Sequence, residues 1–496
     1  MPVFLDSQSP GFEAAFSALL NAKREDSVDV DDAVAAIIAD VRARGDAALI
    51  ELTERFDRQA LTPDTLAFSG AEIDAACAKV GPDDRAALEL AAERIRAYHV
   101  RQTPEDQMWT DPDGATLGWR WSPVSAAGLY VPGGLASYPS SVLMNAIPAK
   151  VAGVGRLAIA VPTPDGLANP LVLLAARIAG VDEIYRIGGA QAIAAFAYGT
   201  ETIAPVDKIT GPGNAFVAAA KRRVFGKVGI DMIAGPSEIL VIADADNDPD
   251  WIALDLLSQA EHDESAQSIL ITTDAVFGKA VAGAVDARLK TLDRRAIAGA
   301  SWRDFGAVIT VPDLATAAAL SDRIAPEHLE LCVADPDALA DRITHAGAIF
   351  LGQWTPEAIG DYIGGPNHVL PTARSARFSS GLSVLDFLKR TTLARMSPDA
   401  LSEKIHHAGA IFLGQWTPEA IGDYIGGPNH VLPTARSARF SSGLSVMDFV
   451  KRTTLARMTP ESLRAIGPAA EVLAQSESLE AHGLSVRARL DRLNEG

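Results

Sequence analysis

The chain of 496 residues has few cysteines and a deficit of basic charge. Only Cys77 and Cys332 are present, too few for a disulfide framework or a thiolate zinc site, so any metal must be held by nitrogen and oxygen ligands. The formal net charge of −19 repels phosphate backbones, and the one compact basic run, Lys221-Arg222-Arg223, is too small to reverse this field. Nucleic acid is therefore not an expected partner.

Long apolar runs are also lacking. The most apolar stretch, residues 151–181, is interrupted by Arg156, Asp165 and several prolines, and the first residues lack a basic region followed by an apolar core. A content of 48% apolar and 22% charged residues is ordinary for a globular protein with large buried cores. We expect a cytoplasmic protein that does not contact a membrane.

Periodicity predicts the fold class. Apolar residues recur at three and four positions over residues 30–41 and 83–95, which indicates helices near the N-terminus. Beyond about residue 115, β-branched runs alternate with alanine-rich stretches, which is typical of βαβ units. The predicted strands are 157–161, 183–189, 208–211, 239–243, 268–272, 307–311, 329–333 and 347–351. Their number predicts an α/β fold with two Rossmann-like parallel-sheet domains, a helical N-terminal segment and a small helical C-terminal tail domain.

Domain boundaries follow from the same pattern. We expect an N-terminal helical segment (1–114) feeding a first α/β domain (115–235), then a second α/β domain (236–375), a linker with a repeated unit (376–459) and a helical tail (460–496).

One unit is written twice. Residues His345–Met396 recur as His407–Met458, offset by 62 positions, with only Leu385 changed to Met447 and Leu388 to Val450 over 52 aligned residues. Two copies are fewer than the three or so that a solenoid needs, so a recent duplication is the simpler interpretation. A parallel sheet has room for one such strand at that edge, so the other copy must be displaced, add a further strand or exchange with a partner chain.

Two glycine turns occupy strand-to-helix junctions, Ile187-Gly-Gly-Ala-Gln191 and Thr210-Gly-Pro-Gly-Asn214. Such turns let a backbone approach an anion at a helix N-terminus, although neither is the usual dinucleotide fingerprint of three spaced glycines. A tight turn that needs glycine for geometry alone explains them equally well.

Histidines and acids form four candidate places for chemistry. Gln259 and His262 are three apart on a predicted helix, 250–263, and could share a cation, while a solvated histidine at an acidic helix end is the alternative. Glu327-His328 puts a carboxylate beside an imidazole where a helix or turn is predicted to begin, a pair able to move two protons.

The remaining two places lie further along the chain. Asp361 and His368 lie in a Gly/Pro-rich loop after an apolar strand, the position where ligands of open α/β sheets gather. Glu477 and His482 are five apart, and a histidine at a helix C-terminus is the simpler explanation for the second.

In chain order, eight motifs resemble those of the histidinol dehydrogenases. They are Gly128-Leu-Tyr-Val-Pro-Gly-Gly, Ile187-Gly-Gly-Ala-Gln, Thr210-Gly-Pro-Gly-Asn, Ala234-Gly-Pro-Ser-Glu, Leu257-Ser-Gln-Ala-Glu-His, Ala325-Pro-Glu-His-Leu, Gly360-Asp-Tyr and Asn367-His-Val-Leu-Pro-Thr. The resemblance covers the chain apart from the extra copy. It implies a zinc-dependent oxidation of L-histidinol to L-histidine through the aldehyde with two NAD, and a homodimer whose exchanged tails complete each site.

Residue by residue, the resemblance implies these roles. The zinc ligands, one ion per subunit, would be Gln259, His262, Asp361 or its duplicate Asp423, and His482 of a partner chain. The catalytic pair would be Glu327 and His328. The substrate would contact Ser237, Gln259, His262, His328, Asp361, His368 or its duplicate His430, Glu477 and His482. NAD would contact Tyr130, Gln191 and Asn214.

Spacing along the sequence does not decide which copy of the repeat supplies the zinc-binding aspartate. Asp361 keeps its spacing from Glu327, whereas Asp423 keeps its spacing from His482. We expect Asp361 to be used, because its strand closes locally with less entropy lost. Two rival functions are a zinc-independent NAD alcohol or aldehyde dehydrogenase and an inactive dimeric scaffold broken by the duplication.

Overall fold

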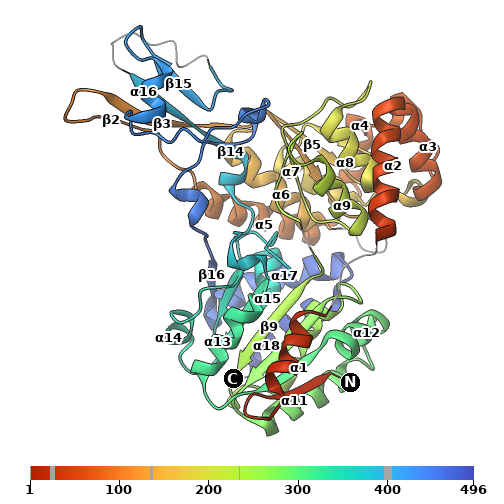
Figure 1. The fold of residues 1–496 in the computed structure, drawn as a ribbon. Helices are drawn as coiled ribbons and strands as arrows, with labels where there is room; N and C mark the ends of the chain where they lie inside the picture. Colours follow the sequence, from red (N-terminus) through yellow and green to blue (C-terminus); the bar gives the residue numbers. More distant parts are fainter. Residues whose placement is uncertain (1, 23–27, 134–137, 234, 396–404, 496) are drawn as a thin grey trace.

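The computed structural model describes residues 2–22, 28–133, 138–233, 235–395 and 405–495. It contains two parallel sheets flanked by helices and a third, mixed sheet that projects from the side of the molecule (Figure 1). In the described part of the chain, no helix is long and apolar enough to cross a membrane.

The first sheet has five parallel strands in the order β6-β5-β4-β7-β8. Their bounds are β4 (Ala126–Tyr130), β5 (Arg156–Ala160), β6 (Glu183–Tyr185), β7 (Lys208–Thr210) and β8 (Gly229–Ile230). The connecting helices are α6 (Pro139–Ala152), α7 (Pro170–Ala179), α8 (Gly189–Tyr198) and α9 (Ala215–Val224), and the helices that pack against them are α2 (Val28–Arg44), α3 (Asp46–Asp57), α4 (Gly70–Cys77) and α5 (Pro82–Val100).

The second sheet has seven parallel strands in the order β1-β11-β10-β9-β12-β13-β16. Their bounds are β1 (Val3–Asp6), β9 (Glu238–Ala243), β10 (Gln267–Thr272), β11 (Ala307–Thr310), β12 (His328–Cys332), β13 (Ala348–Leu351) and β16 (Thr454–Arg457). Its helices are α1 (Phe12–Leu20), α10 (Pro249–Ala260), α11 (Ala275–Arg288), α12 (Arg295–Phe305), α13 (Leu314–Ile324), α14 (Pro336–Ala340) and α15 (Glu357–Tyr362). The tail helices α17 (Pro460–Ser476) and α18 (Glu480–Glu495) pack on α5 and α10.

The third sheet has the order β15-β14-β3-β2. It consists of β2 (Gln107–Thr110), β3 (Thr116–Pro123), β14 (Leu388–Arg395) and β15 (Ala410–Leu413), and α16 (Glu419–Tyr424) follows β15. Strands β14 and β15 are parallel, whereas β14 runs antiparallel to β3.

The α/β fold is confirmed, and a strand is present at each of the eight predicted places, although β6 ends at Tyr185 instead of residue 189. The N-terminal segment differs from the expectation, because it begins with a strand, β1, that pairs with β11 at the edge of the second sheet. The four-residue strand is too short to show the alternation that marks a half-buried strand. The division into five domains stays a prediction.

The two copies of the repeat exchange their last strands. Strand β13 of the first copy pairs with β16 of the second, and β15 of the second pairs with β14 of the first. The register is the same in both pairs: Ala348 lies opposite Thr454, and Ala410 lies opposite Thr392. Each copy therefore supplies the strand that completes the other.

Side-chain contacts show where the exchange occurs. The Arg452 backbone N–H donates to Ser380 Oγ at 2.8 Å, and in the same way the Arg390 N–H donates to Ser442 Oγ at 2.8 Å. Since residues up to Lys389 follow the first copy and residues from Arg452 follow the second, 390–451 form a 62-residue insertion. We call this insertion, 390–451, the displaced copy. Its strands belong to a separate sheet, so the seven-stranded sheet contains only one Ala-Ile-Phe-Leu strand in the described part of the chain.

Candidate functional site

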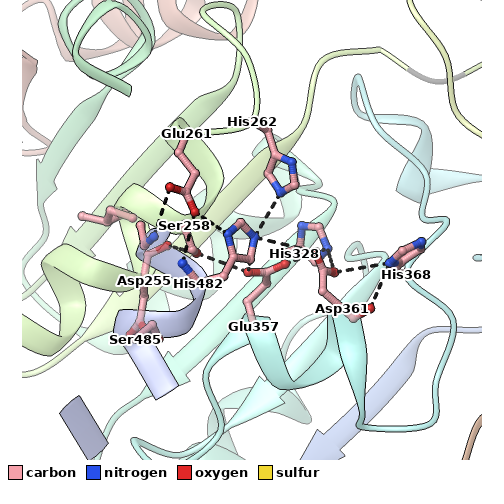
Figure 2. A network of polar contacts seen from close by, with 12 residues as sticks. Asp255, Ser258, Glu261, His262, His328, Glu357, Asp361, His368, His482 and Ser485 are labelled. Carbon is pink, nitrogen blue, oxygen red and sulfur yellow. Dashed lines mark hydrogen bonds and ion pairs between the residues drawn. The ribbon is translucent and has the colours of Figure 1, made fainter. Parts of the chain in front are cut away.

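Three predicted zinc ligands come together: His262 from the turn after α10, Asp361 from α15 and His482 from α18. His262 and His482 face each other with their Nε2 atoms 3.1 Å apart (Figure 2). Asp361 Oδ2 lies 3.8 Å from His482 Nε2, and one ligand atom of each of the three residues lies within 4.8 Å of the others. Desolvation, together with the nearby His482, lowers the pKa of His262 to about 3, so its ring is neutral at pH 7. Neutral imidazoles and a carboxylate are donors that Zn²⁺ prefers.

Glu261 fixes the orientation of His482. Its Oε1 accepts a hydrogen bond from His482 Nδ1 at 2.7 Å, and its two oxygens also accept the backbone N–H groups of Ala481 and His482 at 3.0 and 3.1 Å. Both side chains are fully buried. Because Glu261 binds Nδ1, the other ring nitrogen, Nε2, is the one that faces the cluster.

Gln259 brings an unsatisfied acceptor. In the last turn of α10, its buried Oε1 has no hydrogen-bond partner among the described residues. An unpaired buried oxygen is costly, and a cation would satisfy it. The donor set of Gln259, His262, Asp361 and His482 therefore fits a nitrogen-and-oxygen metal site.

Glu357 is a buried acid at this site that the sequence did not single out. Its Oε1 lies 3.7 Å from His328 Nε2, and its Oε2 accepts from Ser258 Oγ at 3.2 Å. Burial raises the pKa of Glu357 well above its usual value, and the charge of Asp361 raises it further. The only local signal is its place four residues before Asp361, one turn along α15.

The neighbouring pair Glu327 and His328 lies at the start of β12. Glu327 Oε2 accepts the Glu238 N–H at 3.0 Å, and His328 Nδ1 donates to the Glu238 carbonyl at 3.0 Å. His328 Nε2 has no hydrogen-bond partner among the described residues and lies 3.8 Å from Asp361 Oδ1. Burial lowers the pKa of His328, so its Nε2 is an unprotonated base beside the candidate metal-binding cluster.

Asp361 joins the cluster to His368. Burial alone would raise the pKa of Asp361, but the surrounding histidines, His368 first, hold it below its usual value. His368 Nδ1 donates to the Asp361 carbonyl at 3.1 Å, and its Nε2 lies 3.4 Å from Ser141 Oγ. The second contact reaches α6 of the first domain.

Glu477 makes a second link to α6. Its Oε1 accepts the Ser140 N–H at 2.9 Å, at the helix N-terminus. Burial raises the pKa of Glu477 to about 8, so it is largely a neutral acid at pH 7. The first turn of α6 therefore contacts both Glu477 and His368.

The predicted NAD contacts lie at or just beyond the carboxyl ends of β4, β6 and β7 in the five-stranded sheet. Tyr130 ends β4 and accepts the Gly189 N–H on its hydroxyl at 3.1 Å, Gln191 lies in the first turn of α8, and Asn214 caps α9. The connections leave β4 and β7 in opposite directions, which makes a topological switch point where α/β sheets bind nucleotides. The Asn214 Oδ1 accepts two backbone N–H groups of α9, so part of its role is local geometry.

Ser237 does not belong to the hydrogen-bonded cluster of described residues. It directly precedes β9, and its backbone carbonyl accepts the Gln267 N–H at 2.9 Å. Asp423 and His430 also lie apart, because both are exposed on the displaced copy. The first copy therefore supplies the clustered aspartate.

Three local expectations are corrected. His262 lies just beyond α10, which ends at Ala260, because Glu261 terminates the helix. His328 begins a strand, since the segment after Pro326 pairs with β9 and β13. Asp361 lies in α15, and the Gly/Pro-rich loop begins after it.

One expectation for the tail is corrected, because His482 does not lie at a helix C-terminus. His482 is in the first turn of α18 and reaches the cluster from its own chain. The two-residue connection between β16 and α17 leads the tail directly back over the second domain of the same chain. The exchange of tails between two chains stays a prediction.

A family model of the histidinol dehydrogenases matches residues 20–403 and 392–490, so that each match contains one copy of the repeat. A histidinol dehydrogenase of Ruegeria pomeroyi is 73% identical over 494 residues, covering 100% of both chains. One of Bradyrhizobium diazoefficiens is 64% identical over 401 residues, which are 81% of this chain and 93% of that protein, so that relative is shorter by about one copy of the repeat. The crystal structure of a histidinol dehydrogenase from Elizabethkingia anophelis, 32% identical, superposes with a TM-score of 0.76 over 99% of both chains. The chain belongs to the histidinol dehydrogenase family.

Proposed function

We propose that this chain oxidises L-histidinol to L-histidine through histidinaldehyde, with two NAD, as the last step of histidine biosynthesis. The observation that supports this most directly is the partly buried His262–His482 pair beside Glu327-His328, in a chain of this family. An alcohol that becomes an acid loses two hydrides, and each oxidation also releases a proton that a positioned base must accept.

We assign one zinc ion per subunit to Gln259, His262, Asp361 and His482. When bound, zinc would supply a Lewis acid that orients the imidazole and amine of the substrate. Glu261 holds His482 ready for this role, as partners of metal-bound histidines commonly do.

His328 and Glu327 handle the protons. The free Nε2 of His328 takes the proton of the alcohol as the first hydride leaves for NAD. Glu327 takes a proton from the water that adds to the aldehyde, and the resulting hydrate gives up the second hydride to a second NAD. Cys332 is buried in β12 and is not required, because the aldehyde is hydrated rather than bound as a thiohemiacetal.

Substrate and cofactor contacts complete the proposal. Ser237, His368 and Glu477 contact the substrate, and the neutral carboxyl of Glu477 would serve as a hydrogen-bond donor. Tyr130, Gln191 and Asn214 hold NAD above the carboxyl ends of the first sheet. The homodimer and the cytoplasmic location stay predictions.

Stoichiometry tests this function. Purified chain supplied with zinc, NAD and limiting histidinol should form two NADH per histidinol, and chelation should remove both activity and metal. One NADH per substrate that persists after chelation would instead indicate a zinc-independent alcohol dehydrogenase, and no NADH would indicate the scaffold.

A further inference from the structure

The displaced copy keeps its local structure outside the core. The His430 Nδ1 donates to the Asp423 carbonyl at 2.9 Å, as His368 does to Asp361 at 3.1 Å. A small pocket lined by Asp423, Asn429, His430 and Thr392 corresponds residue by residue to the one lined by Asp361, Asn367, His368 and Thr454. The displaced copy is therefore a folded duplicate of this part of the site, without the Glu327-His328 pair and the zinc-binding histidines.

The two copies are already interchangeable at one strand. Strand β16 of the second copy completes β13 in the register that β14 uses with β15. The sheet thus accepts a strand from either copy at this edge.

In the rest of the unit, the sequences of the two copies differ at only two positions. Leu385 and Leu388, which are Met447 and Val450 in the second copy, are partly rather than fully buried. A volume-conserving change and the loss of one methylene would reduce the population with the second copy in the core by roughly tenfold.

The chain can accommodate the alternative insertion point. Placing the second copy in the core moves the extra 62 residues to the segment before β13, where residues 341–344 are mostly exposed. Exposed turns tolerate insertions, and the entropy of closing a loop rises slowly with its length.

We propose that either copy can occupy the core, so that Asp423 and His430 serve as a second set of site residues in place of Asp361 and His368. Which copy lies in the core is determined as the chain folds, and the second copy lies there in a minority of molecules. The roles of the two residues rest on the proposed function, whereas the exchange itself does not.

A cross-link measures the two arrangements. In a variant carrying Leu351→Cys, Leu413→Cys and Arg457→Cys, position 457 lies opposite 351 when the first copy is in the core, and would lie opposite 413 when the second copy is there. After oxidation, tryptic peptides beginning Ile343-Thr-His and Ile405-His-His distinguish the two links. We expect about a tenth of the links at 413, and more in an Asp361→Ala background refolded with zinc.

Zinc retention provides the second measurement. The full-length Asp361→Ala variant, refolded with zinc and dialysed, should keep about a tenth or more of the wild-type zinc and activity. Asp361→Ala/Asp423→Ala, which lacks both carboxylates, should lose at least a hundredfold. Equal losses in the single and double variants, or no link at 413 in the zinc-refolded Asp361→Ala background, would overturn the proposal. The cross-link and the zinc content decide it even if histidinol is not the substrate.

Discussion

Glu261 decides which nitrogen of His482 faces the proposed zinc site, because it accepts a hydrogen bond from Nδ1 and from two backbone N–H groups of α18. Glu261→Gln keeps the size but removes the charge, so we expect zinc affinity to fall by about 10- to 100-fold. Zinc content after dialysis against a graded chelator measures this. Glu264→Gln, at an exposed position three residues on, should leave zinc retention unchanged, and equal loss in both variants would contradict this role.

A second residue couples stability to pH. Burial lowers the pKa of His99 to about 4, and its Nδ1 donates to the Ile95 carbonyl at 2.7 Å. In the unfolded chain, His99 is protonated as the pH falls below about 6.5, whereas in the folded chain it stays neutral until the pH approaches 4. The free energy of unfolding is therefore unaffected by His99 above pH 6.5 and decreases as the pH falls towards 4. His99 thus makes the folded state about 2 kcal/mol less stable at pH 5 than at pH 7.

The His99→Gln variant isolates this effect. We expect the difference in unfolding free energy between pH 7 and pH 5 to shrink by about 2 kcal/mol in urea titrations, because glutamine does not titrate. His406→Gln removes an exposed histidine and should keep the full difference. An unchanged pH dependence in the His99 variant would show that the pKa of His99 does not differ between the folded and unfolded chains.

At the residue scale, the sequence predicted part of the site. Gln259 and His262 were visible as a spaced pair, but His482 and Asp361 became ligand candidates only through the family resemblance, because they are 121 positions apart. Glu261 and Glu357 were not predicted as site residues, because an acidic side chain in a helix is normally solvated. Only the tertiary structure shows that these two are buried. Spacing along a chain cannot report burial.

At the scale of elements, a buried ion pair attaches tail helix α18 to α10. Arg489 in α18 donates to both oxygens of Asp255 in α10, at 2.9 and 2.6 Å, and both side chains are buried. Arg489→Ala would leave the Asp255 charge uncompensated and should lower the free energy of unfolding by about 3–5 kcal/mol. Because α18 carries His482, zinc retention should fall with it.

The matched double variant separates charge from packing. Asp255→Leu/Arg489→Met removes both charges at similar volume, so it should lose much less stability than Arg489→Ala in urea titrations. If the double variant is as unstable as the single one, packing by the arginine stem rather than the buried charge holds the tail.

The sequence predicted elements best where both faces of a strand are buried. The apolar runs that became β9, β10 and β12 have every residue buried, which is typical of strands in a parallel sheet. In contrast, β2 is exposed along its length and β1 nearly so, and no apolar run marked them. The pairing of β14 with β3 depends on the insertion, so no local pattern could predict it.

In the whole molecule, the extra 62 residues interrupt one copy of the unit and do not form a second domain. Residues 390–451 begin with the last strand of one copy and end with the first part of the next, a permuted unit whose strands pair with each other. Side chains that are buried in the first copy are solvent-exposed in this unit: Tyr424 is 84% exposed, whereas its counterpart Tyr362 is 1% exposed. The insertion thus adds an apolar surface while leaving the clustered residues in place.

Deletion of residues 390–451 tests this view. It joins Lys389 to Arg452 and restores one uninterrupted copy, with β13 next to β16 and all the clustered residues retained. We expect zinc content and NADH formation within about twofold of the full chain, because only contacts of the projecting sheet are lost, together with less aggregation in size-exclusion chromatography. Deletion of 345–406 leaves the same unit except for Met447 and Val450, so it should behave alike. If the first deletion loses zinc while the full chain retains it, the inserted unit contributes to the site, and the interruption is part of the working enzyme.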